Sequence, residues 1–226
     1  MPTVRVYPSS EKYVDKLLNI ENANPDRLYS ALSFLSSLYF PDNTILKFYK
    51  KIDDSKLSIA DVLLKRKRKR TENIFNLERK EIYEATAFTG IIEQGIVHNQ
   101  DTSFRISPIE IISTLKEIIL QLETCQKFEI AITREIMPFV YLLSPPITVL
   151  IDVRSNYEYQ QIQGILIEDS SPYEMFYSDF QRIWASENTI NSKDYIIQLI
   201  KDNILEWEFG RSINLDKWPK MIVNNR

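Results

Sequence analysis

Six consecutive basic residues, residues 65–70, are the feature that most constrains this chain of 226 residues. The formal net charge at pH 7 is only −3, so the run concentrates positive charge that the rest of the chain more than offsets. Clustered lysine and arginine side chains favour a polyanionic partner, and nucleic-acid phosphate is the obvious one. Anionic lipid, a targeting receptor or a solvated face without any partner are the alternatives for such a run.

The residues that follow the run predict a helix and then a hairpin. Apolar residues recur at mostly helical spacing over residues 77–94, and Gly95 stands where a helix can close in a left-handed conformation. Two short strand-like segments, residues 96–98 and 103–106, then flank a turn rich in Asn and Asp. We therefore expect a helix able to enter a DNA groove, followed by a β-hairpin wing.

Composition indicates a folded protein of the cytoplasm. The chain is 44% hydrophobic and 26% charged, which is typical of globular rather than disordered proteins. The single cysteine, Cys125, cannot form an internal disulfide, and no basic-then-apolar leader opens the sequence. No apolar run reaches the 18 or so residues that a membrane span needs, so no membrane association is expected.

Helix signals dominate the part of the chain before the basic run. A short strand is expected over residues 3–7, and a helix follows it to about Asn22. Asn24 and Pro25 then predict the start of a second helix that Pro41 ends. Residues 45–52 suit either a strand or a short helix, and a helix starting near Ser58 is expected to continue into the run.

The second half alternates strand and helix patterns. Ser107 and Pro108 open a helix with a broad apolar face, and strands are expected over 128–132, 147–153 and 164–167. Helices over about 169–184 and 195–204 complete it. The expected fold is α+β, a helical and winged-helix N-terminal half followed by a small sheet packed with helices. The expected division is a DNA-binding region (1–106), a linker or dimerisation helix (107–126), a sensor or interaction domain (127–210) and an irregular tail (211–226).

Two stretches resemble known families. Residues 57–108 resemble the winged-helix domain of TrmB-like regulators, in which a recognition helix ends in glycine, a wing follows, and a helix led by Ser and Pro continues. Residues 149–152, 164–169 and 175–184 are similar to the effector-binding half of such regulators and to helix-turn-helix proteins that carry a degenerate phospholipase-D-like half. The resemblance implies a DNA-binding protein with an attached sensor domain.

Several kinds of chemistry lack the residues that they need. Phospholipase-D-like enzymes use two histidines with nearby lysines, but His98 is the only histidine here and is followed by Asn99 and Gln100. One Cys and one His cannot build a structural zinc site, and four glycines provide no glycine-rich phosphate loop. We expect no catalytic residue, no metal ligand and no cofactor.

Carboxylates in the second half offer an alternative. Asp152, Glu158, Glu168 and Asp169 cluster there, and Asp152, Glu168 and Asp169 at expected strand ends could meet at one sheet edge as an acidic, metal-dependent nuclease site. No lysine occurs between Lys127 and Lys193, however, so the usual acidic–acidic–lysine arrangement is not available locally. Carboxylates that cap helices or face water are the preferred interpretation.

The leading hypothesis is a cytoplasmic, non-catalytic transcriptional regulator that binds double-stranded DNA as a homodimer, with a C-terminal domain for ligand sensing or dimerisation. The alternative is an adaptor subunit that binds a protein partner through the apolar helix 109–122 and the aromatic helix 173–184. A nuclease is the third possibility. The residues expected to contact DNA phosphates or bases are Lys65, Arg66, Lys67, Arg68, Lys69, Arg70, Arg79, Lys80, Tyr83, Thr86, Asn99, Gln100 and Arg105.

Overall fold

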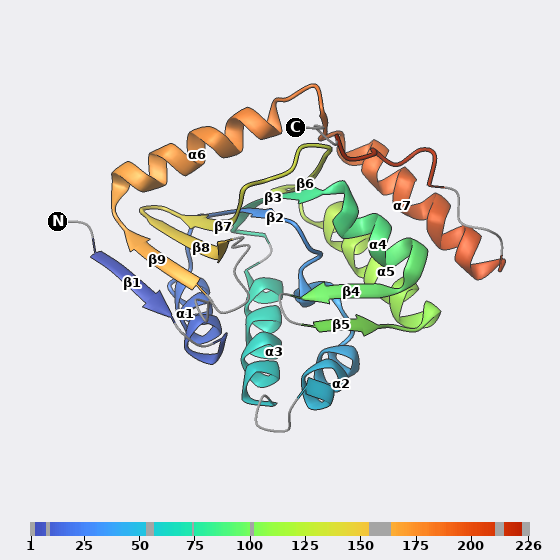
Figure 1. The fold of residues 1–226 in the computed structure, drawn as a ribbon, viewed down its shortest axis with the longest axis horizontal. Helices are drawn as coiled ribbons and strands as arrows, with labels where there is room; N and C mark the ends of the chain where they lie inside the picture. The colour runs from blue at the N-terminus through green and yellow to red at the C-terminus, as the bar shows by residue number, and fades with distance from the viewer. Residues whose placement is uncertain are drawn as a thin grey trace.

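The computed structural model describes residues 3–7, 10–52, 57–73, 75–99, 102–153, 164–210 and 215–222. Its fold is α+β, with an eight-stranded mixed sheet and a separate two-stranded hairpin (Figure 1). The strands are β1 (Thr3–Tyr7), β2 (Arg27–Leu32), β3 (Glu78–Glu84), β4 (Ile96–Asn99), β5 (Thr102–Arg105), β6 (Phe128–Thr133), β7 (Phe139–Ser144), β8 (Ile147–Val153), β9 (Gly164–Glu168) and β10 (Thr189–Ile190). The helices are α1 (Ser10–Asn22), the short 3-10 helix η1 (Ser37–Tyr39), α2 (Asp42–Ile52), α3 (Leu57–Glu72), α4 (Ala85–Gln94), α5 (Pro108–Thr124), α6 (Ser170–Trp184) and α7 (Lys193–Glu208).

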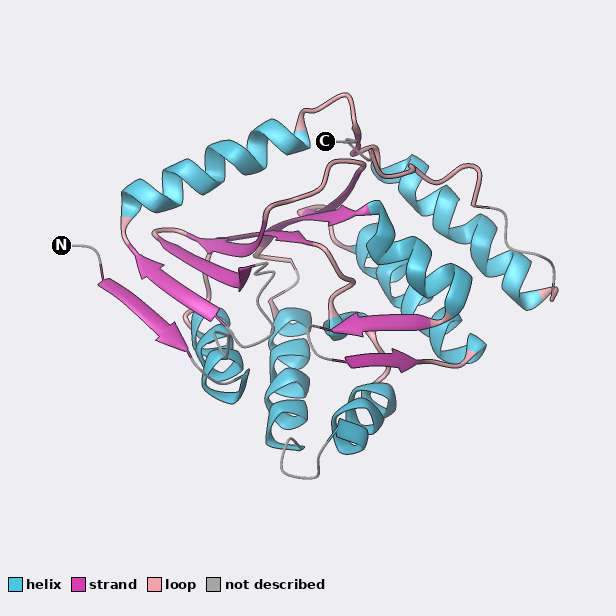
Figure 2. Cartoon of the chain, in the orientation of Figure 1, coloured by secondary structure: helices cyan, strands magenta, loops and turns pink. Residues whose placement is uncertain are grey.

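The sheet order is β1-β9-β8-β7-β2-β3-β6-β10. Strands β2, β3 and β6 are mutually parallel at its centre, and the remaining neighbours are antiparallel. Strands from both predicted halves of the chain are therefore hydrogen-bonded in one sheet, and the first half does not form a winged helix of its own. Figure 2 shows the β4–β5 hairpin apart from this sheet.

The predicted helix over residues 77–94 is wrong in its first half. Residues 78–84 form β3, and only residues 85–94 are helical, as α4. In β3 the side chains of Arg79, Glu81 and Tyr83 share one face of the sheet, an alternation that a search for apolar residues misses because two of the three are charged. Gly95 does close α4 with φ of 63°, and the hairpin that follows it is confirmed.

The predicted helix after Asn24 is also wrong, because residues 27–32 form the central strand β2 and only η1 is helical before Pro41. This strand is buried over five of its six residues, and a fully buried strand shows no polar alternation that separates it from a buried helix. Residues 45–52 lie within the helix α2. The expected strands and helices of the second half are confirmed, with β7 and the short β10 added.

Two apolar layers hold the sheet. One face packs mainly on α1, α3, α4, α5 and α7, and the other face packs on α6 through the aromatic residues Tyr173, Phe176 and Phe180. Figure 1 shows α6 on one side of the sheet and α1 and α3 on the other. The predicted linker helix α5 belongs to the first layer, where Ile111, Leu115 and Ile118 are fully buried.

Chain segments outside the sheet complete this layer. In the predicted irregular tail, residues 215–222 are free of helix and strand, and Trp218 is buried against Phe88. None of the helices in the described ranges is long and apolar enough to cross a membrane.

The close approach of α1 to β9 generates a first prediction. A Cβ atom added to Gly164 would stand 2.3 Å from Cδ2 of the Tyr13 ring, well inside van der Waals contact. Gly164→Ala should therefore lower the free energy of unfolding by about 1–3 kcal/mol, the usual cost of overpacking. In a Tyr13→Ala background, which removes the three atoms nearest to that Cβ, the same glycine substitution should change the free energy of unfolding by no more than about 0.5 kcal/mol. Equal costs in the two backgrounds, measured by urea unfolding, would contradict this packing.

Candidate nucleic-acid interface

The basic run lies in α3, and helical geometry divides it between the interior and the surface. Arg66 and Arg70 are four residues apart, so they share one face of the helix, and they are only 6% and 7% exposed. Lys65 and Arg68 are exposed on the opposite side, while Lys67 and Lys69 are half-buried. The run is therefore two sets of side chains with different surroundings.

The inward set is neutralised by a carboxylate on α1. Both Nε and Nη2 of Arg66 donate hydrogen bonds to the two oxygens of Glu21, over 3.1 and 2.9 Å. Nε of Arg70 donates to Oε1 of the same carboxylate over 2.8 Å. A bidentate arginine–carboxylate pair fixes orientation as well as charge, so this contact sets the register of α3 against α1.

A second carboxylate extends the buried cluster into the sheet. Glu81 on β3 accepts a hydrogen bond from Nη1 of Arg70 over 3.2 Å, and both Tyr39 and Tyr83 donate their hydroxyls to its other oxygen. Arg79, also on β3, lies 3.5 Å from Glu81.

The guanidinium of Arg79 has further partners. It stands 3.8 Å from the centre of the Phe128 ring and donates to Gln121 on α5. The aromatic face of Phe128 and the amide oxygen of Gln121 together take the place of a third carboxylate beside this cation. We call Glu21, Arg66, Arg70, Arg79 and Glu81, with the side chains that they contact, the buried charge cluster.

The pKa values follow from this pairing. Burial alone would raise the pKa of Glu21, but Arg66 and Arg70 outweigh it and hold that pKa below its ordinary value. Burial would likewise raise the pKa of Glu81, and Arg79 and Arg70 together with the tyrosine hydrogen bonds lower it overall. Burial and the neighbouring Glu81 raise the pKa of the Tyr39 and Tyr83 hydroxyls, which therefore stay protonated as donors. Both carboxylates are thus ionised at neutral pH.

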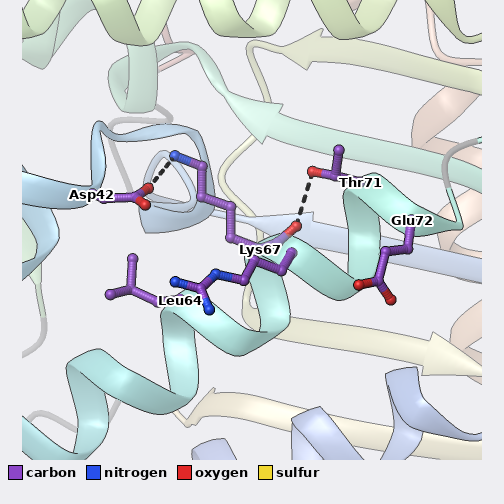
Figure 3. A pocket seen from close by; sticks show the side chains of 6 residues that line it. Asp42, Leu64, Lys67, Thr71 and Glu72 are labelled. Atoms are coloured by element: carbon purple, nitrogen blue, oxygen red, sulfur yellow. Dashed lines mark hydrogen bonds and ion pairs between the residues drawn. The ribbon is translucent and has the colours of Figure 1, made fainter.

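The outward set borders a shallow surface hollow between α3 and the start of α2. Lys67 extends from α3 to Asp42, with Nζ 2.8 Å from its carboxylate (Figure 3). The same Nζ lies 2.9 Å from the carbonyl oxygen of Phe40. Arg68 lies on the same side of the helix, and neither it nor Lys65 forms an ion pair with any residue that the structure describes. The hollow is lined by Asp42, Leu64, Lys67, Arg68, Thr71 and Glu72.

Four of the residues predicted to contact DNA are unavailable for it. Arg66, Arg70, Arg79 and Tyr83 are buried in the charge cluster, so their side chains do not reach the surface. The expectation fails because burial of these charges is compensated by partners distant in the sequence, which local pattern does not reveal.

The other predicted contacts are scattered. Thr86 on α4 and Arg105 at the end of β5 are exposed, whereas Lys80 is partly covered by Trp184 and lies 3.3 Å from Glu129. The Asn99 side chain and all of Gln100 lie outside the described residues. Lys65, Arg68 and Lys69 thus remain as the predicted residues that one helical face brings together.

The described carboxylates of the proposed nuclease alternative do not form a metal site. Glu168 lies 3.5 Å from Lys16, and Asp169 accepts a hydrogen bond from the backbone of Ser171 and caps α6. The side chain of Asp152 and the whole of Glu158 lie outside the described residues. Within the described part of the chain, no group of three or more His, Cys, Asp or Glu side chains could hold a metal ion.

The apolar surfaces assigned to the adaptor alternative are used inside the molecule. The broad face of α5 packs into the core through Ile111, Leu115 and Leu122, and the aromatic face of α6 covers the sheet. The prediction that these two faces are free for a partner is wrong, because the large mixed sheet offers each of them a surface to cover.

Sequence reasoning missed the partners of the buried arginines, namely Glu21, Tyr39, Glu81 and Gln121. Two local signals were present. The four-residue spacing of Arg66 and Arg70 places them on one helical face, and the two-residue spacing of Arg79, Glu81 and Tyr83 places them on one face of a strand. The identity of the opposing carboxylates required the fold.

No protein-family model matches this chain, and no curated protein matches it. Among solved structures it is similar to TrmBL2, an archaeal chromatin protein described as showing a novel mode of DNA binding, with 10% identity and a TM-score of 0.46 over 81% of this chain and 52% of that one. It is also similar to Nuc, a phospholipase D family member from Salmonella typhimurium, with 10% identity and a TM-score of 0.44 over 85% of this chain and 99% of that one.

A third similar structure is the phosphatidylserine synthase of Haemophilus influenzae Rd KW20, with 9% identity and a TM-score of 0.44 over 94% of this chain and 47% of that one. The chain thus spans about half the length of TrmBL2 and of this synthase. The similar structures include both kinds of protein named by the sequence resemblance, and at these identities and TM-scores they assign no activity to this chain.

Two substitutions within the basic run should separate its inward and outward sets. Arg70→Met leaves Glu21 and Glu81 without one cation and should lower the free energy of unfolding by about 3–5 kcal/mol. Lys65→Met, five positions earlier in the same helix, should change it by no more than about 0.5 kcal/mol because its side chain is exposed. Urea unfolding measures the free energy of unfolding of both variants. Equal losses would contradict the division of the run into a buried and an exposed set.

The cluster also predicts how stability depends on pH. Because Glu21 and Glu81 have a folded pKa below that of the unfolded chain, their contribution is complete above about pH 4.3 and is lost as pH falls through the folded pKa values. Glu21→Gln should be less stable than the natural chain near pH 7 but should lose less stability between about pH 5 and about pH 3. The control Glu187→Gln replaces an exposed carboxylate outside the cluster and should change the free energy of unfolding near pH 7 by no more than about 0.5 kcal/mol. Parallel profiles for the natural chain and Glu21→Gln would count against the assignment.

Proposed function

We propose that this protein is a non-catalytic nucleic-acid-binding regulator that holds double-stranded DNA by its phosphates. The observation that carries the proposal is the outward face of α3, where Lys65 and Arg68 are exposed without an ion-pair partner in the described part of the chain, and Lys69 lies beside them. We call these three residues the cationic stripe. Lys65 and Arg68 are available to a partner, whereas Arg66 and Arg70 of the same run are committed to the interior.

The spacing of the stripe suits a phosphate backbone. Residues three and four apart lie one above the other on a helix, so Lys65, Arg68 and Lys69 form one continuous surface. Lys69 lies 3.9 Å from the exposed Glu72, an ion pair that a phosphate can replace at little cost because surface pairs contribute about 0–1 kcal/mol. Phosphate contacts position a protein on DNA without reading sequence, and three such contacts make binding depend steeply on salt.

A homodimer fits this proposal. One stripe of three cations provides modest affinity, whereas two copies of the chain would present two stripes to one duplex and multiply their contributions. Each stripe would then contact its own segment of backbone.

The cationic stripe can be tested against a matched set of charges. Replacing Lys65, Arg68 and Lys69 with Ser should weaken binding to random-sequence duplex DNA at low salt and reduce the magnitude of the slope of log affinity against log salt by about 3. The control replaces Lys116, Lys201 and Lys217 with Ser, which removes three exposed lysines from α5, α7 and the tail while the net charge changes by the same amount.

The control should retain most of the affinity and nearly the full salt slope, because its three charges do not lie on α3. Equal losses in the two variants would show that only net charge matters and would overturn the proposed interface. Urea unfolding of both variants confirms that each is folded, and changes within about 0.5 kcal/mol are expected for each of the exposed side chains.

A further inference from the structure

An aromatic ring stands exposed at the end of the cationic helix. Phe75, three residues beyond the last residue of α3, is 70% exposed, the second most exposed of the large hydrophobic side chains in the described part of the chain. A phenylalanine in that position contributes little to the core, whereas Leu77, two residues later, is buried.

The turn that carries Phe75 is held by its own backbone. The amide of Asn73 donates to the carbonyl of Lys69, and the amides of Asn76 and Leu77 both donate to the carbonyl of Asn73. The side chain of Asn73 also donates to Asn24 over 2.9 Å, which ties the turn to the loop before β2. Phe75 is therefore presented from an anchored turn, and little conformational entropy is lost when a ligand covers its ring.

Positive charge is present close to the turn that carries this ring. The cationic stripe lies along the helix that leads to the turn, and the rise of a helix places Lys65 about 10 Å from Glu72 along the axis. Nζ of Lys127, an exposed residue before β6, lies 3.5 Å from the carbonyl oxygen of Asn76, the residue that follows Phe75. An exposed aromatic ring close to cations matches the way in which proteins hold single-stranded nucleic acid, with a base on the ring and phosphates on the charges.

We propose that Phe75 is a stacking platform for one unpaired base of a single-stranded nucleic acid, whose backbone follows the cationic stripe and Lys127. This inference rests on the proposed nucleic-acid function and specifies the substrate class of the same surface. Bases inside a duplex are stacked on one another and cannot cover Phe75, so this ring should favour a single strand or an opened end over intact duplex. The stripe itself contacts phosphate in either form.

The test compares strands that differ only in their bases. Binding is measured for oligothymidylate of about twelve nucleotides, for the matching oligouridylate, for an abasic strand of the same length and for duplex DNA. Phe75→Ala should weaken binding of strands with bases about 5- to 150-fold, the equivalent of about 1–3 kcal/mol of stacking on one base, and should leave the abasic strand and the duplex unchanged. Phe75→Trp should restore binding, because any aromatic face can stack. A difference between the deoxy and ribo strands then identifies which of the two the site prefers.

A second exposed phenylalanine provides the control. Phe209, beyond the end of α7, is 68% exposed, and Phe209→Ala should leave every affinity unchanged. If Phe75→Ala binds oligothymidylate and oligouridylate as tightly as the natural chain does, the stacking proposal is overturned. If the triple Ser variant of the stripe nevertheless loses affinity, the proposed function still stands. Loss of strand binding in Phe75→Ala, with full binding of strands and duplex by the triple Ser variant, would show the reverse: it would support stacking and overturn the proposed phosphate contacts of the stripe. Absence of binding to all four probes would overturn both.

Discussion

The structure depends on the neutralisation of two buried carboxylates by arginines from a neighbouring helix. Glu21 on α1 and Glu81 on β3 are both nearly inaccessible to water, and an isolated charge in such a place would cost several kcal/mol. Arg70 contacts both carboxylates, so a single side chain of α3 connects α1 to the centre of the sheet. Replacing the whole cluster with apolar residues could leave stability unchanged, but removing one member cannot, because its partner is then left charged and buried.

The cluster contains three arginines and two carboxylates, and the third cation explains the surroundings of Arg79. Its guanidinium lies over the Phe128 ring and donates to Gln121, so aromatic and amide groups replace a carboxylate. These contacts add β6 and α5 to the elements that meet at one point. The buried charges therefore specify how α1, α3, α5, β3 and β6 pack together, in addition to any contribution to stability.

The same arrangement determines what remains for binding. A straight helix with six consecutive basic residues cannot direct all of them to one side, because successive residues are rotated by about 100° around the axis. The two arginines that face inward hold the fold, and the stripe that faces outward is available to a polyanion. The basic run is thus shared between structure and binding, and its charge alone exaggerates the size of the surface that nucleic acid could contact.

Sequence patterns predicted the amphipathic helices and apolar strands but not the charged interior. The helix α5 and the strands β6, β8 and β9 follow from apolar periodicity, and Gly95 correctly marked the end of α4. Strand β3 was missed because its buried face is built from Arg79, Glu81 and Tyr83, which simple hydrophobic patterns place in solvent. The winged-helix expectation failed for the same reason, since it required these residues to be a DNA-facing helix. Partners such as Glu21, 45 residues before Arg66, become visible only in three dimensions.

The most direct test of this account is a double-mutant cycle between Glu21 and Arg66, with Glu21→Gln and Arg66→Met measured singly and together by urea unfolding at neutral pH. Arg66 hydrogen-bonds to Glu21 through two nitrogens, so the account predicts a coupling energy of about 1–3 kcal/mol, with the double variant more stable than the sum of the single losses implies. A coupling energy near zero would show that the two side chains do not stabilise one another, and would contradict the buried charge cluster as the organising contact of the fold.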